Sequence, residues 1–115
     1  MFESIFIEIQ KNNPEIKCIG VWGKDGLELE RRTFSDSTLN LELIGAQFAD
    51  IISKFEGLPI SSQRSHIRLD YGSHFLAVYS VTDDYFMVVL AEPDILPGRL
   101  NFYIDLRRDE LRAIL

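Results

Sequence analysis

Hydrophobic residues along the chain follow two periods, one typical of helices and one typical of strands. Residues 2–10 carry apolar side chains every three or four positions, so this segment is predicted to be a first helix. The apolar run 16–22 predicts a strand, and Asp25-Gly26 just after it is a strong hairpin signal because the turn needs positive φ. In residues 27–32 Leu27, Leu29 and then Arg31 alternate with charged side chains, so we expect a second strand with one solvated face at a sheet edge.

The segment from Thr38 to Glu56 carries the clearest helical pattern in the sequence. A cluster of Ser, Asp and Thr residues at its start can cap its amino end, and Gly57 and Pro59 are typical of a carboxyl end. Large apolar residues form one stripe along this predicted helix: Leu41, Ile44, Phe48, Ile51, Ile52 and Phe55. Such a stripe is the apolar face of an amphipathic helix.

A second stripe on the same helix consists of small residues. Its members are Gly45, Ala46, Ala49 and Ser53. Glu42 and Glu56 continue the line, whereas the neighbouring face with Asp50 is polar. Small side chains permit close approach by another element, and Gly45 inside a helix costs about 1 kcal/mol relative to alanine. We therefore interpret the small stripe as a contact surface; mere tolerance of small residues is the alternative.

Three further strands are predicted after this helix. Residues 65–70 alternate the apolar Ile67 and Leu69 with polar side chains, which predicts another edge strand. The run 74–81 is apolar on both faces, and the run 85–91 has no polar face at all. A strand of this last kind must be covered on both sides, so it belongs in the centre of the sheet with helices above and below.

The end of the sequence fits two patterns. Residues 100–106 alternate as a strand would, whereas Arg107 to Leu115 is helical by composition. We favour one helix from about Gly98 onward. The predicted order of elements is therefore α-β-β-α-β-β-β-α, an α+β fold with a five-stranded antiparallel sheet.

Composition limits the classes of function. The chain has 115 residues, of which 46% are hydrophobic, and we expect one domain over residues 1–115. The net charge is −6 and no basic patch stands out, so we expect no nucleic-acid binding and no membrane insertion. The sequence shows no signal peptide and no run long enough to span a bilayer. With the lone Cys18, which suits a reducing compartment, this predicts a cytoplasmic protein.

The residues that could carry catalysis do not form a recognisable site. His66 and His74 lack further metal ligands at zinc spacing, and Cys18 lies in an apolar strand without a base. Asp83 and Asp84, like Asp25, fall in predicted turns, where aspartate bonds the nearby backbone. We expect no enzyme activity, no metal and no cofactor.

Several local strings, in this order, resemble the roadblock (dynein light-chain) family. The string from Ile19 to Leu29, IGVWGKDGLEL, resembles that family's first hairpin. His66 to Leu69 fits its third strand, and Asp83 to Leu90, DDYFMVVL, resembles its last strand, in which a short acidic turn precedes an aromatic-aliphatic run. The resemblance extends from Phe2 to about Glu92. The additional C-terminal helix is more similar to prokaryotic members, including regulators of the gliding-polarity GTPase.

The resemblance implies a roadblock/profilin-like sheet, with one helix on one face and the terminal helices on the other. It also implies a dimer, with itself or with a paralogous roadblock protein, in which two sheets join edge to edge and the second helices lie side by side. The implied interface residues come from the long helix and from the edge strand 65–71: Glu42, Gly45, Ala46, Ala49, Asp50, Ser53, His66, Ile67, Arg68, Leu69 and Asp70. The paired helices would bind a small Ras-like GTPase, as an activator or a scaffold, without inserting a catalytic side chain.

Two other functions remain open from the sequence. A small-molecule sensor of the PAS or GAF type shares a central antiparallel sheet, but it needs a cavity lined by convergent polar groups. A structural adaptor subunit with no GTPase partner would share every feature described so far.

Overall fold

The fold is known from a computed structural model that describes residues 1–36, 39–56 and 66–115. Its elements follow the predicted order: α1 (Phe2–Asn12), β1 (Ile16–Gly23), β2 (Glu28–Thr33), α2 (Leu41–Glu56), β3 (His66–Tyr71), β4 (His74–Ser80), β5 (Tyr85–Ala91) and α3 (Pro97–Ile114). The predicted α+β class is confirmed. Thr38, Gly57, Pro59 and Ser65, to which the sequence assigned element boundaries, lie outside the described residues.

The five strands form one antiparallel sheet in the order β2-β1-β5-β4-β3. The two strands with alternating polar residues, β2 and β3, are the edges, as predicted. The uniformly apolar β5 lies in the centre, because its two apolar faces can both be covered only there. The β1–β2 turn contains Gly26 at φ +88°, and the Leu27 amide donates to Asp25 Oδ1 at 3.0 Å, so the hairpin prediction is also confirmed.

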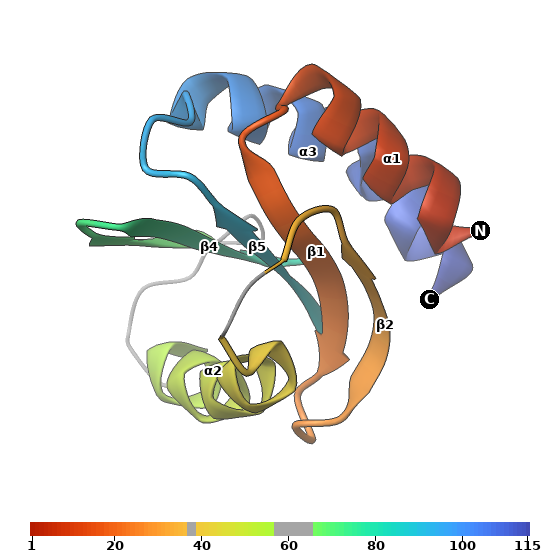
Figure 1. The fold of residues 1–115 in the computed structure, drawn as a ribbon. Helices are drawn as coiled ribbons and strands as arrows, with labels where there is room; N and C mark the ends of the chain where they lie inside the picture. The colour runs from red at the N-terminus through yellow and green to blue at the C-terminus, as the bar shows by residue number, and fades with distance from the viewer. Residues whose placement is uncertain (37–38, 57–65) are drawn as a thin grey trace.

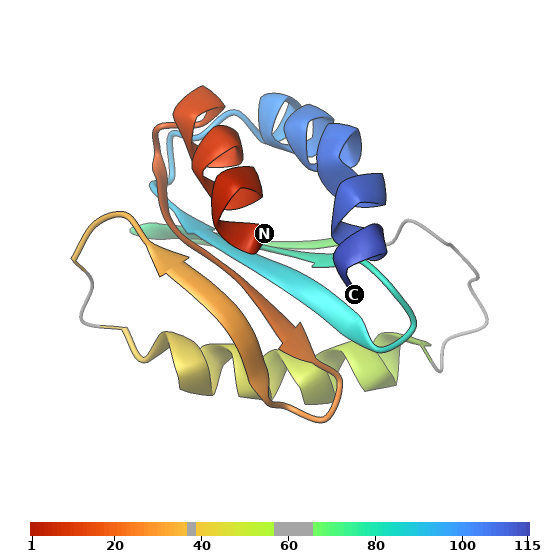
Figure 2. The same ribbon diagram turned by 90° about the vertical axis from the view of Figure 1, so that its right-hand side faces the viewer.

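Helices cover both faces of the sheet. Figures 1 and 2 show α1 and α3 side by side on one face and α2 alone on the other. The core is correspondingly divided. Phe6, Ile19 and Met87 belong to the half under α1 and α3, and Trp22 and Val88 to the half over α2. The layer arrangement that the resemblance implied is confirmed.

The C-terminal segment is a helix throughout. Leu100, Ile104 and Leu111 are buried against the sheet at helical spacing, whereas Phe102 and Leu106 are exposed. The alternation of residues 100–106 therefore reflects the two sides of a helix. Pro97 occupies the first turn, where its missing N–H costs nothing.

The start of α2 differs from the prediction. The helix begins at Leu41, and the Leu43 amide donates to Asn40 Oδ1 at 3.0 Å. Asn40 is thus the capping residue, in place of the preceding Ser, Asp and Thr cluster. Asparagine caps as well as serine does, so composition alone could not choose between these neighbouring positions.

One partly buried polar cluster holds the start of α3 against the α1–β1 connection. Arg99 donates to both carboxylate oxygens of Glu15, at 2.7 and 2.5 Å, and to Oδ1 of the fully buried Asn13, at 3.0 Å. The hydrogen bonds from Arg99 hold the pKa of Glu15 below its ordinary value. Burial acts on this pKa in the opposite direction and is the weaker effect.

Replacing Arg99 with alanine is expected to lower the free energy of unfolding by about 1 kcal/mol at neutral pH. A carboxyl group with a depressed native pKa contributes stability above its unfolded pKa and loses it as the pH falls through the native pKa. The difference between wild type and Arg99→Ala should therefore shrink below about pH 4. Urea unfolding at pH 7 and pH 3 measures it. Arg32→Ala, which removes the more exposed pair with Glu3, is the control and should change little at either pH.

Candidate interaction surface

Strand β3 offers an unpaired edge. Among the described residues it pairs only with β4, from His66 opposite Tyr79 to Tyr71 opposite His74. An exposed edge carries free N–H and C=O groups, which another strand can satisfy. The strand is short and partly charged, which limits unspecific pairing without preventing a specific partner.

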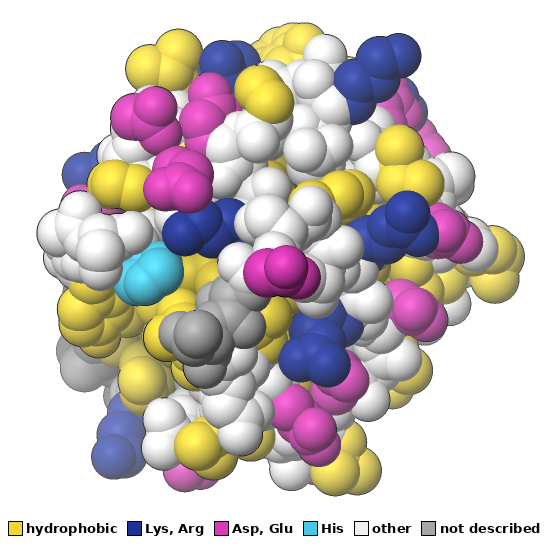
Figure 3. Space-filling model, viewed as in Figure 1, with side chains coloured by type: hydrophobic (Ala, Val, Ile, Leu, Met, Phe, Trp, Pro, Cys, Tyr) yellow, Lys and Arg dark blue, Asp and Glu magenta, His cyan; other side chains and the backbone are white. Residues whose placement is uncertain are grey.

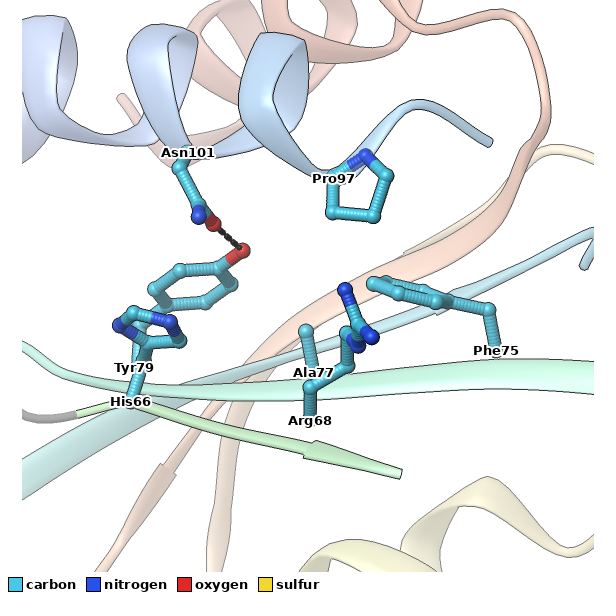
Figure 4. Close-up of a pocket in the computed structure, with 7 residues that line it drawn as sticks. All are labelled: His66, Arg68, Phe75, Ala77, Tyr79, Pro97 and Asn101. Carbon is cyan, nitrogen blue, oxygen red and sulfur yellow. Dashed lines mark hydrogen bonds between the residues drawn. The ribbon is translucent and has the colours of Figure 1, made fainter. Parts of the chain in front are cut away.

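The two faces of β3 differ in character. Ile67 and Leu69 are half-buried and pack toward α2. The alternating residues His66, Arg68 and Asp70 lie on the α3 side and are exposed. Figure 4 shows His66 and Arg68 projecting from β3 toward α3. The edge therefore has an apolar side and a charged side.

Helix α2 packs on the sheet through its small residues. Gly45 is buried and Ala49 is 3% exposed. A Cβ built on Gly45 would lie 2.1 Å from Cε2 of Trp22, and one on Gly20 would lie 2.5 Å from Cζ3 of the same ring. The indole of Trp22 is thus held between a glycine of β1 and a glycine of α2.

The interpretation of the small stripe is therefore corrected for two of its members. Gly45 and Ala49 let the chain's own Trp22 and sheet approach α2, and neither is available to another chain. A stripe of small residues indicates that another element packs closely on the helix. It does not indicate whether that element belongs to the same chain or to a second one. A charged side chain at Ala49 would disturb folding, so the surface must be probed at exposed positions.

Gly45→Ala is expected to lower the free energy of unfolding by about 2 kcal/mol, because overpacking outweighs the better helix propensity of alanine. Trp22 is 1% exposed, so its ring has nowhere to move. The matched control is Gly98→Ala in α3, where an added Cβ meets nothing within 4 Å. That variant should be neutral or slightly stabilised. Urea unfolding followed by circular dichroism compares the two; a stabilised Gly45→Ala would contradict the packing described.

The orientation of α2 that places Gly45 against Trp22 leaves three apolar residues pointing outward. Leu43 and Phe55 are each 51% exposed, and Ile51 is 36% exposed. The sequence had placed Ile51 and Phe55 on the apolar face with Leu41 and Phe48, and for these two residues that grouping is wrong as a statement of burial. The physical reason is Trp22: the helix turns its glycine toward the ring, which moves the centre of the buried face.

The flank that carries Ile51 and Phe55 points toward β3, whereas Leu43 points away from the sheet. The opposite flank faces the β1–β2 hairpin, where Ala46 lies 3.9 Å from a Cβ built on Gly26 and the Lys24 ammonium donates to the Glu56 carboxylate. At 100° per residue, Ile51 and Phe55 lie on the other side of the helix. Half-buried Ile44 lies on the same side of the helix as Ile51 and Phe55, and it packs against the core half that Ile67 and Leu69 of β3 also pack against.

We call the apolar residues of this α2 flank and of the β3 edge together the α2/β3 surface: Ile44, Ile51, Phe55, Ile67 and Leu69. It combines a free strand edge with an apolar helix flank on the same face of the sheet. In Figure 3 hydrophobic side chains are visible on the left of the molecule, between the β3–β4 hairpin and α2.

The other predicted interface residues lie apart from this flank. Glu42, Asp50 and Ser53 are exposed, and the Ser53 hydroxyl donates to the Ala49 carbonyl at 3.0 Å. Ala46 is half-buried next to the hairpin. The sequence contained one signal for this flank that the prediction of the interface did not use. The apolar stripe of α2 has two large residues, Ile51 and Phe55, beyond those that the helix needs to cover its side of the sheet.

A cavity of about 230 Å³ lies on the charged side of β3, between β3, β4 and α3. Its lining, shown in Figure 4, consists of His66, Arg68, Phe75, Ala77, Tyr79, Pro97 and Asn101. The Tyr79 hydroxyl donates to Asn101 Oδ1 at 2.6 Å, and burial raises the pKa of Tyr79, so the phenol stays neutral. Arg68 Nε lies 3.3 Å from Asp70 Oδ2. The polar groups of the cavity are therefore bonded to one another or to neighbours along β3, with His66 stacked on Tyr79.

Groups with catalytic potential lie in unreactive settings. Burial raises the pKa of the Cys18 thiol to about 11, so it is protonated at neutral pH. Within residues 1–36, 39–56 and 66–115, no three His, Cys, Asp or Glu side chains converge as a metal site would require. None of the helices in the described part of the chain is long and apolar enough to cross a membrane.

The order of elements, the two-sided helix cover and the free β3 edge define a roadblock-type fold, and solved structures agree. No family model and no curated protein matches the sequence. The chain is similar to a roadblock/LC7 domain from Streptomyces avermitilis, with a TM-score of 0.78 at 12% identity, covering 96% of this chain and 94% of that one. It is also similar to MglC from Myxococcus xanthus, with a TM-score of 0.70 at 18% identity, covering 99% and 98%.

A third similar structure is MglB in a tetrameric arrangement, with a TM-score of 0.78 at 12% identity, covering 97% of this chain and 85% of that chain. Identities this low show a common fold. The resemblance that the sequence strings carried is confirmed at that level.

Proposed function

We propose that this chain is a non-catalytic protein-interaction subunit that acts as a single domain and pairs, through the α2/β3 surface, with a second copy or a paralogous roadblock protein. The observation that carries the proposal is that β3 is an edge strand of the sheet and that α2, on one face of that sheet, carries an exposed apolar flank. Pairing two such edges would satisfy the free backbone groups and cover Ile51 and Phe55 in one step. The tetrameric arrangement of MglB supports self-association of this fold.

We propose further that the paired subunit regulates or scaffolds a small Ras-like GTPase in the cytoplasm. Support for the GTPase comes from the roadblock resemblance, and support for the compartment comes from the single, buried and unpaired Cys18. The settings of Cys18 and Tyr79 favour binding over catalysis, since both side chains stay protonated and bonded or buried. Regulation would then act by favouring one conformation of the GTPase switch regions.

The experiment is capture followed by a rate measurement. Wild-type chain is used to recover partners from its own cells, and any recovered GTPase is purified. Its rate of GTP hydrolysis is then measured with and without the chain. The proposal expects a GTPase that binds the wild type and either hydrolyses faster or keeps its rate while bound. Recovery of partners without any GTPase would favour the structural-adaptor function instead.

The sensor alternative is tested on the same material. A sensor needs an enclosed cavity, whereas the cavity described here lies at the rim of the sheet beside β3. Native mass spectrometry of the purified chain should show the protein mass alone. A copurifying small molecule would favour the sensor.

A further inference from the structure

The charged and apolar side chains along β3 complement one another when two copies of the strand are aligned on Leu69. We propose that two copies of this chain pair antiparallel through β3 with Leu69 on the twofold axis, so that each Leu69 faces its counterpart. This inference rests on the proposed pairing of two copies through the α2/β3 surface, and what it adds is the register of that pairing.

Geometry first limits the number of registers. Two antiparallel edge strands related by a twofold axis perpendicular to the sheet keep both α2 helices on the same face. Facing residues must then come from the same face of the sheet, because side chains alternate between faces. One residue of the strand must therefore face its own counterpart in the second copy, and the twofold axis passes between the two. The candidates for this residue in the described strand run from His66 to Tyr71.

Charge then separates these candidates. With Arg68 on the axis, two guanidinium groups face each other; with Asp70 on the axis, two carboxylates do. Like charges directly opposite one another oppose pairing. With Leu69 on the axis, Arg68 faces Asp70 of the second copy, and this attraction occurs twice by symmetry. In the free chain the same two side chains are already 3.3 Å apart and half or more exposed, so they can reach a partner without unburying anything.

The apolar side of the strand agrees with this register. Ile67, Leu69 and Tyr71 share the face that carries α2. With Leu69 on the axis, Ile67 faces Tyr71 of the second copy, again twice. Tyr71 is 60% exposed in the single chain and gains a cover. Placing Ile67 on the axis instead moves Tyr71 beyond the end of the described partner strand and sets Arg68 opposite His66, which brings no carboxylate to the guanidinium.

The hairpin fixes which backbone groups are free. Tyr71 and His74 flank the two-residue turn Gly72-Ser73, and Gly72 has φ +52°. Next to such a turn, every second residue forms backbone hydrogen bonds to β4, and these residues are Tyr71, Leu69 and Ile67. The N–H and C=O groups of Arg68 and Asp70 therefore point to the free edge. The Leu69 pair would then be a non-hydrogen-bonded pair, with Cα atoms about 4.5 Å apart, a separation that a disulfide can bridge.

Cysteine substitution tests the register directly. Leu69→Cys, Ile67→Cys and Tyr71→Cys are each oxidised under mild conditions, and cross-linked dimer is followed on non-reducing gels. The proposal expects Leu69→Cys to cross-link with itself at least tenfold faster than either other variant alone. It also expects an equal mixture of Ile67→Cys and Tyr71→Cys to cross-link, since these two positions face each other. Wild type is the control, because Cys18 is 2% exposed and should give no dimer.

The outcomes separate the register from the pairing itself. If the solution mass shows a dimer but Ile67→Cys cross-links fastest alone, the register is overturned and the proposed function stands. If the purified wild type and all three variants stay monomeric, pairing between copies is overturned along with the register. A paralogous partner would then be the remaining form of the proposed function.

Discussion

Phe55→Glu is expected to raise the dissociation constant of the dimer by roughly 30- to 1,000-fold, the equivalent of about 2 to 4 kcal/mol. Phe55 is 51% exposed at the end of the α2 flank that points toward β3. In the dimer a glutamate there would be forced into an apolar contact, where a charge without a partner is costly. Sedimentation velocity over a range of concentrations measures the dissociation constant.

The chain offers a closely matched control. Phe102 lies on α3, is 60% exposed, and belongs to the opposite layer of the molecule. Phe102→Glu makes the same chemical change at similar exposure and should leave the dissociation constant within about threefold of wild type. At a protein concentration low enough for all three proteins to be monomeric, both variants should unfold at the same urea concentration as wild type, because neither side chain is buried in the single chain. Equal weakening by the two variants would contradict the assignment of the surface to α2 and β3.

Trp22→Ala is expected to lower the free energy of unfolding by about 3 to 5 kcal/mol, the range for removing a large aromatic side chain from a core. The ring fills the space between Gly20 and Gly45, two residues without side chains that could collapse into the cavity. Small domains have a total stability of only about 5 to 15 kcal/mol, so a substantial fraction of the variant should be unfolded. Because Trp22 is the single tryptophan, unfolding is followed by circular dichroism.

Trp22→Phe separates packing from hydrogen bonding. The indole Nε1 is buried and has no hydrogen-bond partner among the described residues, so replacing it sacrifices no bond. Phenylalanine keeps most of the contact with the two glycines, and we expect it to cost less than half of the loss seen for alanine. A loss as large as that of Trp22→Ala would mean that Nε1 makes an important interaction.

The elements of this fold could be predicted because their patterns are local. The alternation in β2 and β3 marked them as edges, and the apolar β5 could only be central. Asp25-Gly26 predicted its turn from the φ angle that the turn demands. Boundaries were less certain where neighbouring residues serve equally well, as Asn40 and the residues before it do at the start of α2.

The orientation of α2 could not be predicted from its own sequence. Its large and small stripes lie side by side, and either can face a sheet. The decision depends on Trp22, which is 23 positions before Gly45 in sequence and fits only against a residue without a side chain. This ambiguity also affects the prediction of the interface. The predicted β3 residues lie at an edge of the sheet, whereas Gly45 and Ala49 of α2 are buried inside the molecule.

The solution mass of the purified chain, measured by sedimentation equilibrium from low to high concentration, is the most direct test of the pairing proposed for the α2/β3 surface. We predict a mass that rises to twice the 13.3 kDa of the chain, and a Phe55→Glu variant that stays at the single-chain mass in the same range. A wild-type mass that remains at 13.3 kDa at every concentration would contradict pairing between two copies of this chain.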